Sequence, residues 1–283
     1  MLRKLTGDML ETAAELSWRL CRDVSTRSYP LFQSKNEIKR EYSMRLREEH
    51  GELLGYFSGE ALFGVCGFFV IPPERYLQTV AFYIERDTQK AIDEILAYLK
   101  ENYPGYSINA GLPFENAAVA GPLQQKGFGL AEDSFDLRLT LRDFMRNDRP
   151  QEPALRLAAG RYAEYAEFHD LHFPDIYWNA ERLLSDIARW RIFVHLGDGK
   201  IDGSIFVMMQ SRTAEIFGLW APDAEITREL LCGSIKAVTA ENVKIGEIVF
   251  FVEKGETKNM NAAEACGFRR AAHYRLWRKA FDA

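Results

Sequence analysis

The sequence lacks any apolar run long enough to cross a membrane, and it has no excess of basic residues. The longest apolar stretch, Ala61–Pro72, has the length of a strand, whereas a membrane-spanning helix needs about 20 apolar residues. Lys and Arg number 36 against 41 Asp and Glu, so the net charge of −5 offers nothing to a nucleic-acid backbone. The N-terminal residues alternate acids and bases and do not resemble a signal peptide. We therefore expect neither a membrane nor a nucleic acid as a partner.

Cysteine is also scarce. The four cysteines are far apart and stand in apolar surroundings, and no two form a C-x-x-C pair: Cys21, Cys66, Cys232 and Cys266. This excludes the common zinc and redox motifs and favours a reducing, cytoplasmic location. His169 and His172 have no third ligand spaced to join them, so no metal site is expected.

The chain contains a long internal repeat. Its 283 residues, 47% hydrophobic and 27% charged, have the composition of a globular protein and are enough for two domains. Two pairs of glycines that follow turns recur about 140 residues apart, Gly64 with Gly203 and Gly127 with Gly267. We expect one domain at residues 1–140, a charged, proline-containing linker at 141–154, and a second domain at 155–283.

The order of patterns is the same in both copies. Helical periodicity comes first, then antiparallel strand patterns separated by turn residues, then a strand, a helix and a strand. The clearest helix begins near Thr88, and its counterpart begins near Glu225. This alternation predicts an α/β fold of two tandem domains, each a mixed, mostly antiparallel sheet flanked by helices.

The stretch FENAAVAGPLQQKGF, from Phe114 to Phe128, closes the first copy. Asn116, a short helix and the pair Gly127-Phe128 resemble the N-x-x-A-x-x-x-x-x-x-x-G-F ending of the GCN5-related N-acetyltransferases. The resemblance covers nearly the whole chain and implies a tandem protein of that family. It further implies acetyl-CoA as co-substrate and an amine, on a small molecule or a protein, as acceptor.

The resemblance assigns the cofactor contacts of the first copy mainly to its fourth strand. Backbone groups of residues 79–85, including those of Phe82 and Ile84, would hold the pantetheine arm. Asn116 would be a polar contact to that arm, although a helix cap is an equal explanation of this residue. Arg86 and Lys90 would face the phosphates.

Two residues are candidates for proton transfer. Glu85, at the end of the same strand, would be the general base; a solvated acid at a helix cap is the alternative. The family's general-acid tyrosine is replaced by Leu123 in one copy and Ala263 in the other, and Tyr83 is a possible substitute.

The phosphate-binding motif departs from the family pattern in both copies. The family carries R-x-x-G-x-G before its main helix, because glycines let backbone N–H groups approach a pyrophosphate. Here both helix starts lack glycine and carry acids, Asp87 in one copy and Asp223 in the other, which would fill the phosphate site. Two hypotheses follow: an N-acetyltransferase that works through its first copy, or a catalytically degenerate module that binds acyl-CoA or another ligand.

Overall fold

The computed structural model describes residues 1–144, 152, 154–174, 176–241 and 244–282, and these form two compact units. Unit 1 comprises Met1–Asp133 and His273–Ala283, and unit 2 comprises Ser134–Ala272. Most of the expected linker, 141–154, lies outside the described residues. No helix in the described ranges combines the length and the apolarity that a membrane crossing requires.

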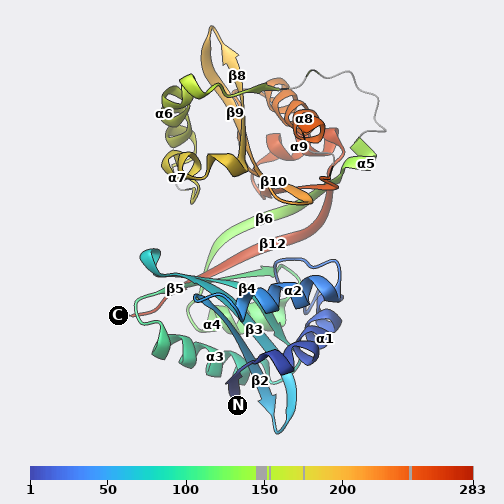
Figure 1. Ribbon diagram of the computed structural model, residues 1–283, viewed down its shortest axis with the longest axis vertical. Helices are drawn as coiled ribbons and strands as arrows, with labels where there is room; N and C mark the ends of the chain where they lie inside the picture. Colours follow the sequence, from blue (N-terminus) through green and yellow to red (C-terminus); the bar gives the residue numbers. More distant parts are fainter. Residues whose placement is uncertain (145–151, 153, 175, 242–243, 283) are drawn as a thin grey trace. The chain divides into compact units, whose positions relative to one another are not determined.

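Unit 1 is a mostly antiparallel sheet with helices on both faces (Figure 1). Its strands lie in the order β1, β2, β3, β4, β5, β12, and only the β4–β5 pair is parallel. The elements of the first repeat are β1 (Leu2–Lys4), α1 (Leu10–Cys21), α2 (Lys35–Arg45), β2 (Gly51–Ser58), β3 (Ala61–Ile71), β4 (Tyr76–Ile84), α3 (Thr88–Asn102), β5 (Ser107–Pro113), α4 (Ala117–Gln125) and β6 (Gly129–Thr140).

Alternation along the strands divides the core of unit 1 into two layers. Phe82 and Ile84 of β4 pack with α3 and α4, whereas Ala81 and Tyr83 pack with α1 and α2. Successive side chains of a strand point to opposite faces, so α3 and α1 cover opposite faces of this sheet.

Unit 2 repeats the arrangement, with strands in the order β6, β11, β10, β9, β8, β7. The β10–β11 pair is parallel, like β4–β5 in unit 1. The remaining elements are α5 (Leu141–Phe144), β7 (Leu155–Arg156), α6 (Tyr162–His172), α7 (Ala180–Ser185), β8 (Trp190–Gly197), β9 (Lys200–Met209), β10 (Thr213–Trp220), α8 (Ala224–Glu241), β11 (Glu247–Glu253), α9 (Thr257–Cys266) and β12 (Arg269–Ala280).

The last strand of each repeat completes the sheet of the other unit. Strand β12 runs antiparallel to β5 of unit 1, with Tyr274 opposite Pro113 and Ala280 opposite Ser107. Likewise β6, from the first repeat, runs antiparallel to β11 of unit 2. The compact units therefore differ from the stretches 1–140 and 155–283, because strand pairing and not sequence order decides which core each last strand joins.

Candidate functional site

The site implied by the resemblance lies where β4 diverges from β5 in unit 1. The parallel pairing covers only Tyr76, Leu77 and Gln78, whereas β4 continues to Ile84. The register between β3 and β4 shifts at this point and passes over Val80, which is a β-bulge. Beyond the bulge no pairing between the described residues of β4 and β5 remains, and β4 leads into α3 at Thr88.

The start of α3 is not closed by a side chain. Its N-cap residue, Asp87, has a left-handed backbone (φ 52°, ψ 37°), and its carboxylate makes no capping hydrogen bond. The Asp87 carboxylate therefore does not cap the first-turn N–H groups of α3, and the expectation that it fills a phosphate site in unit 1 stays a prediction. Lys90 is exposed in that turn, and the Arg86 guanidinium lies over the Phe63 ring, 3.3 Å from its centroid.

Glu85 stands at the end of β4, where the sequence placed it, and forms an ion pair with Arg19 of α1. The hydrogen bond from Arg19 is the main cause that lowers the pKa of Glu85 below its ordinary value. This carboxylate is therefore ionised at neutral pH, and its lowered pKa makes it a weaker base than an unpaired glutamate.

Tyr83 points into the α1/α2 layer and is fully buried. Burial is the main cause that raises its pKa well above the ordinary value. A thiolate leaving group has a pKa near 8.5 as a free thiol, so this hydroxyl is far less acidic than that thiol. It is better suited to donate a hydrogen bond than to deliver a proton.

Asn116 is the N-cap of α4 and is completely buried. Its Oδ1 accepts a hydrogen bond from the Val119 N–H (3.2 Å), and its Nδ2 donates to the Arg27 carbonyl (2.9 Å). Two residues farther along the same connection, the Tyr29 N–H donates to the Gly111 carbonyl of β5 (3.1 Å). Hydrogen bonds thus hold the α1–α2 connection beside the opening. In the sequence, this connection is visible only as a break in helical periodicity at Ser28-Tyr-Pro30.

A His–Asp pair lies beyond the end of β5 and was not anticipated from the sequence. His273 Nε2 contacts Asp133 Oδ1, and Arg275 Nη2 lies 3.3 Å from Asp133 Oδ2. The imidazole of His273 also stacks on Phe114, with ring centroids 4.9 Å apart. These residues come from β12, β6 and the end of β5, so no spacing in the sequence could have brought them together.

In unit 2 the equivalent opening is occupied by the chain itself. The pairing of β10 with β11 ends at Ile216, and a bulge passes over Phe217. From α9, Lys258 Nζ donates to the Ala221 carbonyl and Asn259 Nδ2 donates to the Leu219 carbonyl (3.3 Å). Two side chains of α9 therefore hold carbonyls at the end of β10.

The start of α8 is closed as well. Asp223 Oδ1 accepts hydrogen bonds from the N–H groups of Glu225 and Ile226, both at 2.9 Å. These are the N–H groups that a phosphate would need, so the expectation that a carboxylate fills the phosphate site holds for unit 2. The residues of unit 1 fit a pyrophosphate and a pantetheine arm, whereas those of unit 2 do not.

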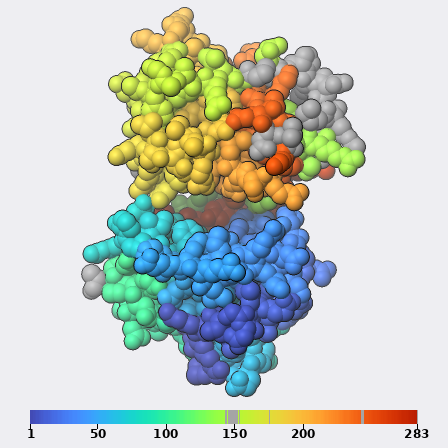
Figure 2. Space-filling model, viewed as in Figure 1, coloured from blue at the N-terminus to red at the C-terminus, as the bar shows by residue number. Residues whose placement is uncertain are grey.

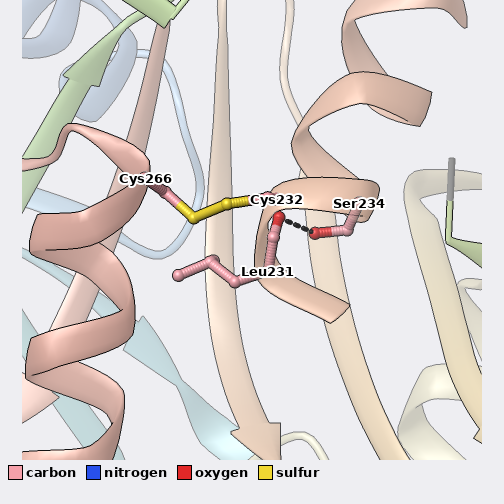
Figure 3. The surroundings of a disulfide bond; sticks show 4 residues. All are labelled: Leu231, Cys232, Ser234 and Cys266. Atoms are coloured by element: carbon pink, nitrogen blue, oxygen red, sulfur yellow. Dashed lines mark hydrogen bonds between the residues drawn. A yellow bond between two sulfur atoms is a disulfide. The ribbon is translucent and has the colours of Figure 1, made fainter. Parts of the chain in front are cut away.

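A disulfide joins the two helices of unit 2 (Figure 3). Cys232 lies in α8 and Cys266 ends α9, with Cα atoms 5.9 Å apart, and both side chains are buried. The cysteines are 34 residues apart in sequence, and only the packing of α8 against α9 brings them together. Disulfides are rare in reducing compartments, so this bond counts against the cytoplasmic location that the sequence favours. That location remains a prediction.

One hollow lies on the surface of unit 1, along α2, whose residues belong to the blue face in Figure 2. It measures about 410 Å³ and is lined mostly by charged side chains: Lys39, Arg40, Ser43, Met44, Arg47 and Glu48. Among the described residues, no three His, Cys, Asp or Glu side chains are clustered so that they could hold a metal ion.

The same fold occurs in solved structures. A GCN5-related N-acetyltransferase from Sphaerobacter thermophilus matches with a TM-score of 0.71 and 14% identity, over 100% of this chain and 96% of its own. A tandem GNAT protein from the clavulanic acid biosynthesis pathway matches with a TM-score of 0.59 and 12% identity, over 99% of this chain and 98% of its own. For a GNAT-family acetyltransferase from Colwellia psychrerythraea the values are 0.54 and 11%, over all of both chains.

Protein-family models and curated protein sequences give no match. At identities this low, similarity of structure shows the fold alone. The fold is that of the GCN5-related N-acetyltransferases, in a tandem arrangement over the whole chain, which confirms the resemblance and the α/β fold class expected from the sequence.

Proposed function

We propose that unit 1 is an N-acyltransferase that moves an acetyl group from acetyl-CoA to an amine. The observation that carries this proposal is the divergence of β4 from β5 after the bulge at Val80, directly before a helix whose first turn is not capped by a side chain. Backbone groups of β4 would hold the thioester of acetyl-CoA at that edge, and the start of α3 would hold the phosphates of the cofactor.

The residues of unit 1 would divide the work as follows. Backbone groups of Phe82 and Ile84 hold the pantetheine arm, because the side chains of both are committed to the core. Lys90, Arg86 and the N–H groups at the start of α3 face the pyrophosphate, where the helix dipole adds favourable charge. Asn116 is buried with its amide bonded to Arg27 and Val119, so it supports the α1–α2 connection and is assigned no contact to the cofactor.

Bound acetyl-CoA supplies an activated acyl group with a thiolate leaving group. The protein has to polarise the thioester carbonyl and remove a proton from the attacking amine. Glu85 is ionised at neutral pH and lies at the end of the diverging strand, so it is the proposed proton acceptor, directly or through water. In unit 2 the capped start of α8 and the hydrogen bonds of Lys258 and Asn259 favour a role without catalysis.

The first test is titration calorimetry of acetyl-CoA into the full-length protein. We expect micromolar binding that Lys90→Glu weakens by at least about tenfold, since a charge-assisted hydrogen bond contributes roughly 1.5–3 kcal/mol. The matched control is Arg228→Glu, near the start of α8, which should leave binding unchanged.

Two results would overturn the proposal. No binding at millimolar acetyl-CoA excludes the transferase and leaves the degenerate ligand-binding module. Binding that Arg228→Glu weakens and Lys90→Glu does not would place the cofactor in unit 2.

A further inference from the structure

The opening between β4 and β5 has two sides, and the connection Arg27–Tyr29 lies across one of them. The Arg27 carbonyl accepts a hydrogen bond from Asn116, the N-cap of α4, and the Tyr29 N–H donates one to the Gly111 carbonyl of β5. The charge of Arg27 also acts on the Tyr83 hydroxyl of β4, whose ionised form it favours. The connection is thus hydrogen-bonded to the β5 side of the opening, and the charge of Arg27 acts on β4 from the face that carries α1 and α2.

Two polar groups beside this connection are buried without a strong hydrogen-bond partner among the described residues. They are Nε of Arg27, and Oη of Tyr83, on which the Cys21 thiol acts as a weak hydrogen-bond partner. Asp23 is close enough to Arg27 for their charges to interact, but it forms no ion pair with it in the described part of the chain. Its Oδ1 instead accepts hydrogen bonds from the N–H and the hydroxyl of Ser25.

Unpaired buried donors are costly to a folded protein, and a water, an ion or a ligand can complete them. Arg27 as a whole is only partly buried, so the guanidinium is not sealed from solvent. A planar guanidinium matches a carboxylate, which can accept two parallel hydrogen bonds. One guanidinium and one neutral hydroxyl balance a single negative charge, which favours a carboxylate over a doubly charged phosphate.

We infer that Arg27, supported by Tyr83, recognises a carboxylate on the acceptor, so that the acceptor is an amine of the amino-acid type. The inference rests on the proposed function, since it names the substrate class of the same site. In the proposed function the phosphates would meet the start of α3, a helix that covers the opposite face of the sheet from α1. The second substrate therefore reaches the thioester from the α1/α2 face, where Arg27 lies.

The carboxylate takes no part in bond exchange. The amine nitrogen forms a bond to the acyl carbon as the carbon–sulfur bond breaks, one ammonium proton is released to the base and solvent, and another ends on the thiol. Arg27 is therefore a specificity-determining residue, and its loss should weaken the discrimination between acceptors more than it slows the reaction of an amine without a carboxylate.

The test compares matched acceptors by thiol release from acetyl-CoA, using L-phenylalanine against phenethylamine and L-lysine against cadaverine. We expect the wild type to prefer at least one amino acid over its decarboxylated partner by about tenfold or more in kcat/KM. Arg27→Gln should lower kcat/KM for the amino acid to about that of its decarboxylated partner, whereas Arg27→Lys should retain part of the preference. Arg22→Gln, an exposed arginine at the end of α1, is the control and should retain all of it.

The outcomes separate this inference from the proposed function. Equal turnover of amino acids and decarboxylated amines overturns the inference and leaves the transferase standing. If no acceptor is acetylated, saturation-transfer NMR of the two amino acids with full-length protein, without acetyl-CoA, decides the inference. Binding that Arg27→Gln removes supports it, and absence of binding overturns it.

Discussion

The ion pair between Glu85 and Arg19 determines when the carboxylate at the end of β4 carries its charge. Because the pKa of Glu85 is lowered in the folded protein, the pair stabilises the fold above the ordinary value of 4.5. That contribution is lost as the pH falls through the lowered pKa. Both side chains remain partly exposed, so the contribution is at most about 1 kcal/mol.

We predict that Arg19→Gln raises the pKa of Glu85 toward its ordinary value, as measured by NMR titration of the carboxyl carbon. If Glu85 accepts the proton of the amine, the acidic limb of the pH profile of kcat/KM moves upward with it. Lys35→Gln is the control, because Lys35 pairs instead with Glu11 and Glu15. An unchanged pKa in Arg19→Gln would show that the ion pair does not persist in solution.

The helices α3 and α8 differ at their N-termini, and this difference decides whether their first-turn N–H groups are available to a ligand. Both helices follow the bulged strand of their unit, and both are preceded by an acid. In α8 the Asp223 carboxylate turns inward and bonds two N–H groups, whereas in α3 the Asp87 carboxylate makes no such bond. The sequence shows an acid at each position but not the backbone conformation that decides which helix start stays open.

Most elements were predictable because they depend on local periodicity and on turn residues. The helices α3 and α8 begin close to where the patterns placed them, and β3 occupies the longest apolar stretch. The partner of a strand is a different matter, since pairing is decided by contacts far apart in sequence. The pairing of β12 with β5 and the hydrogen bond between Asn116 and Arg27 join residues far apart in the chain, so no local sequence pattern predicts them.

The disulfide between α8 and α9 makes a prediction at the scale of these two helices. Cross-linking residues 34 apart restricts the unfolded chain, and reduction should therefore destabilise unit 2 by about 3–4 kcal/mol. Urea unfolding with and without reductant measures the difference. The double variant Cys232→Ala/Cys266→Ala should lose all response to reductant, while Cys21→Ala should respond as the wild type does.

A count of thiols checks the same bond directly. Cys21 and Cys66 are free and buried, so the denatured, unreduced protein should offer two thiols to an alkylating reagent. Four thiols before any reduction would show that the bond between α8 and α9 is not formed in the purified protein.

At the scale of the whole molecule, the exchange of last strands makes each repeat incomplete alone. Trp277 of β12 and Phe281, the residue after this strand, pack in the core of unit 1. The same core contains Phe82 and Ile84 of β4. In the same way Leu137 and Leu139 of β6 belong to the core of unit 2. If each repeat folded as a separate domain, the β12 residues would instead pack in the core of unit 2, and the β6 residues in the core of unit 1. The second repeat can therefore be indispensable to unit 1 even if unit 2 performs no chemistry.

A pair of variants in the second repeat tests this exchange. Trp277→Ala and Phe268→Ala each remove a large buried side chain and should each cost about 3–5 kcal/mol. Because Trp277 packs in unit 1, its loss should reduce hydrogen-exchange protection in β5 and α4. The loss of Phe268, which packs in unit 2, should instead reduce protection in α8 and α9. If Trp277→Ala exposed α8 and α9 instead, β12 would belong to its own repeat and the strands would not be exchanged.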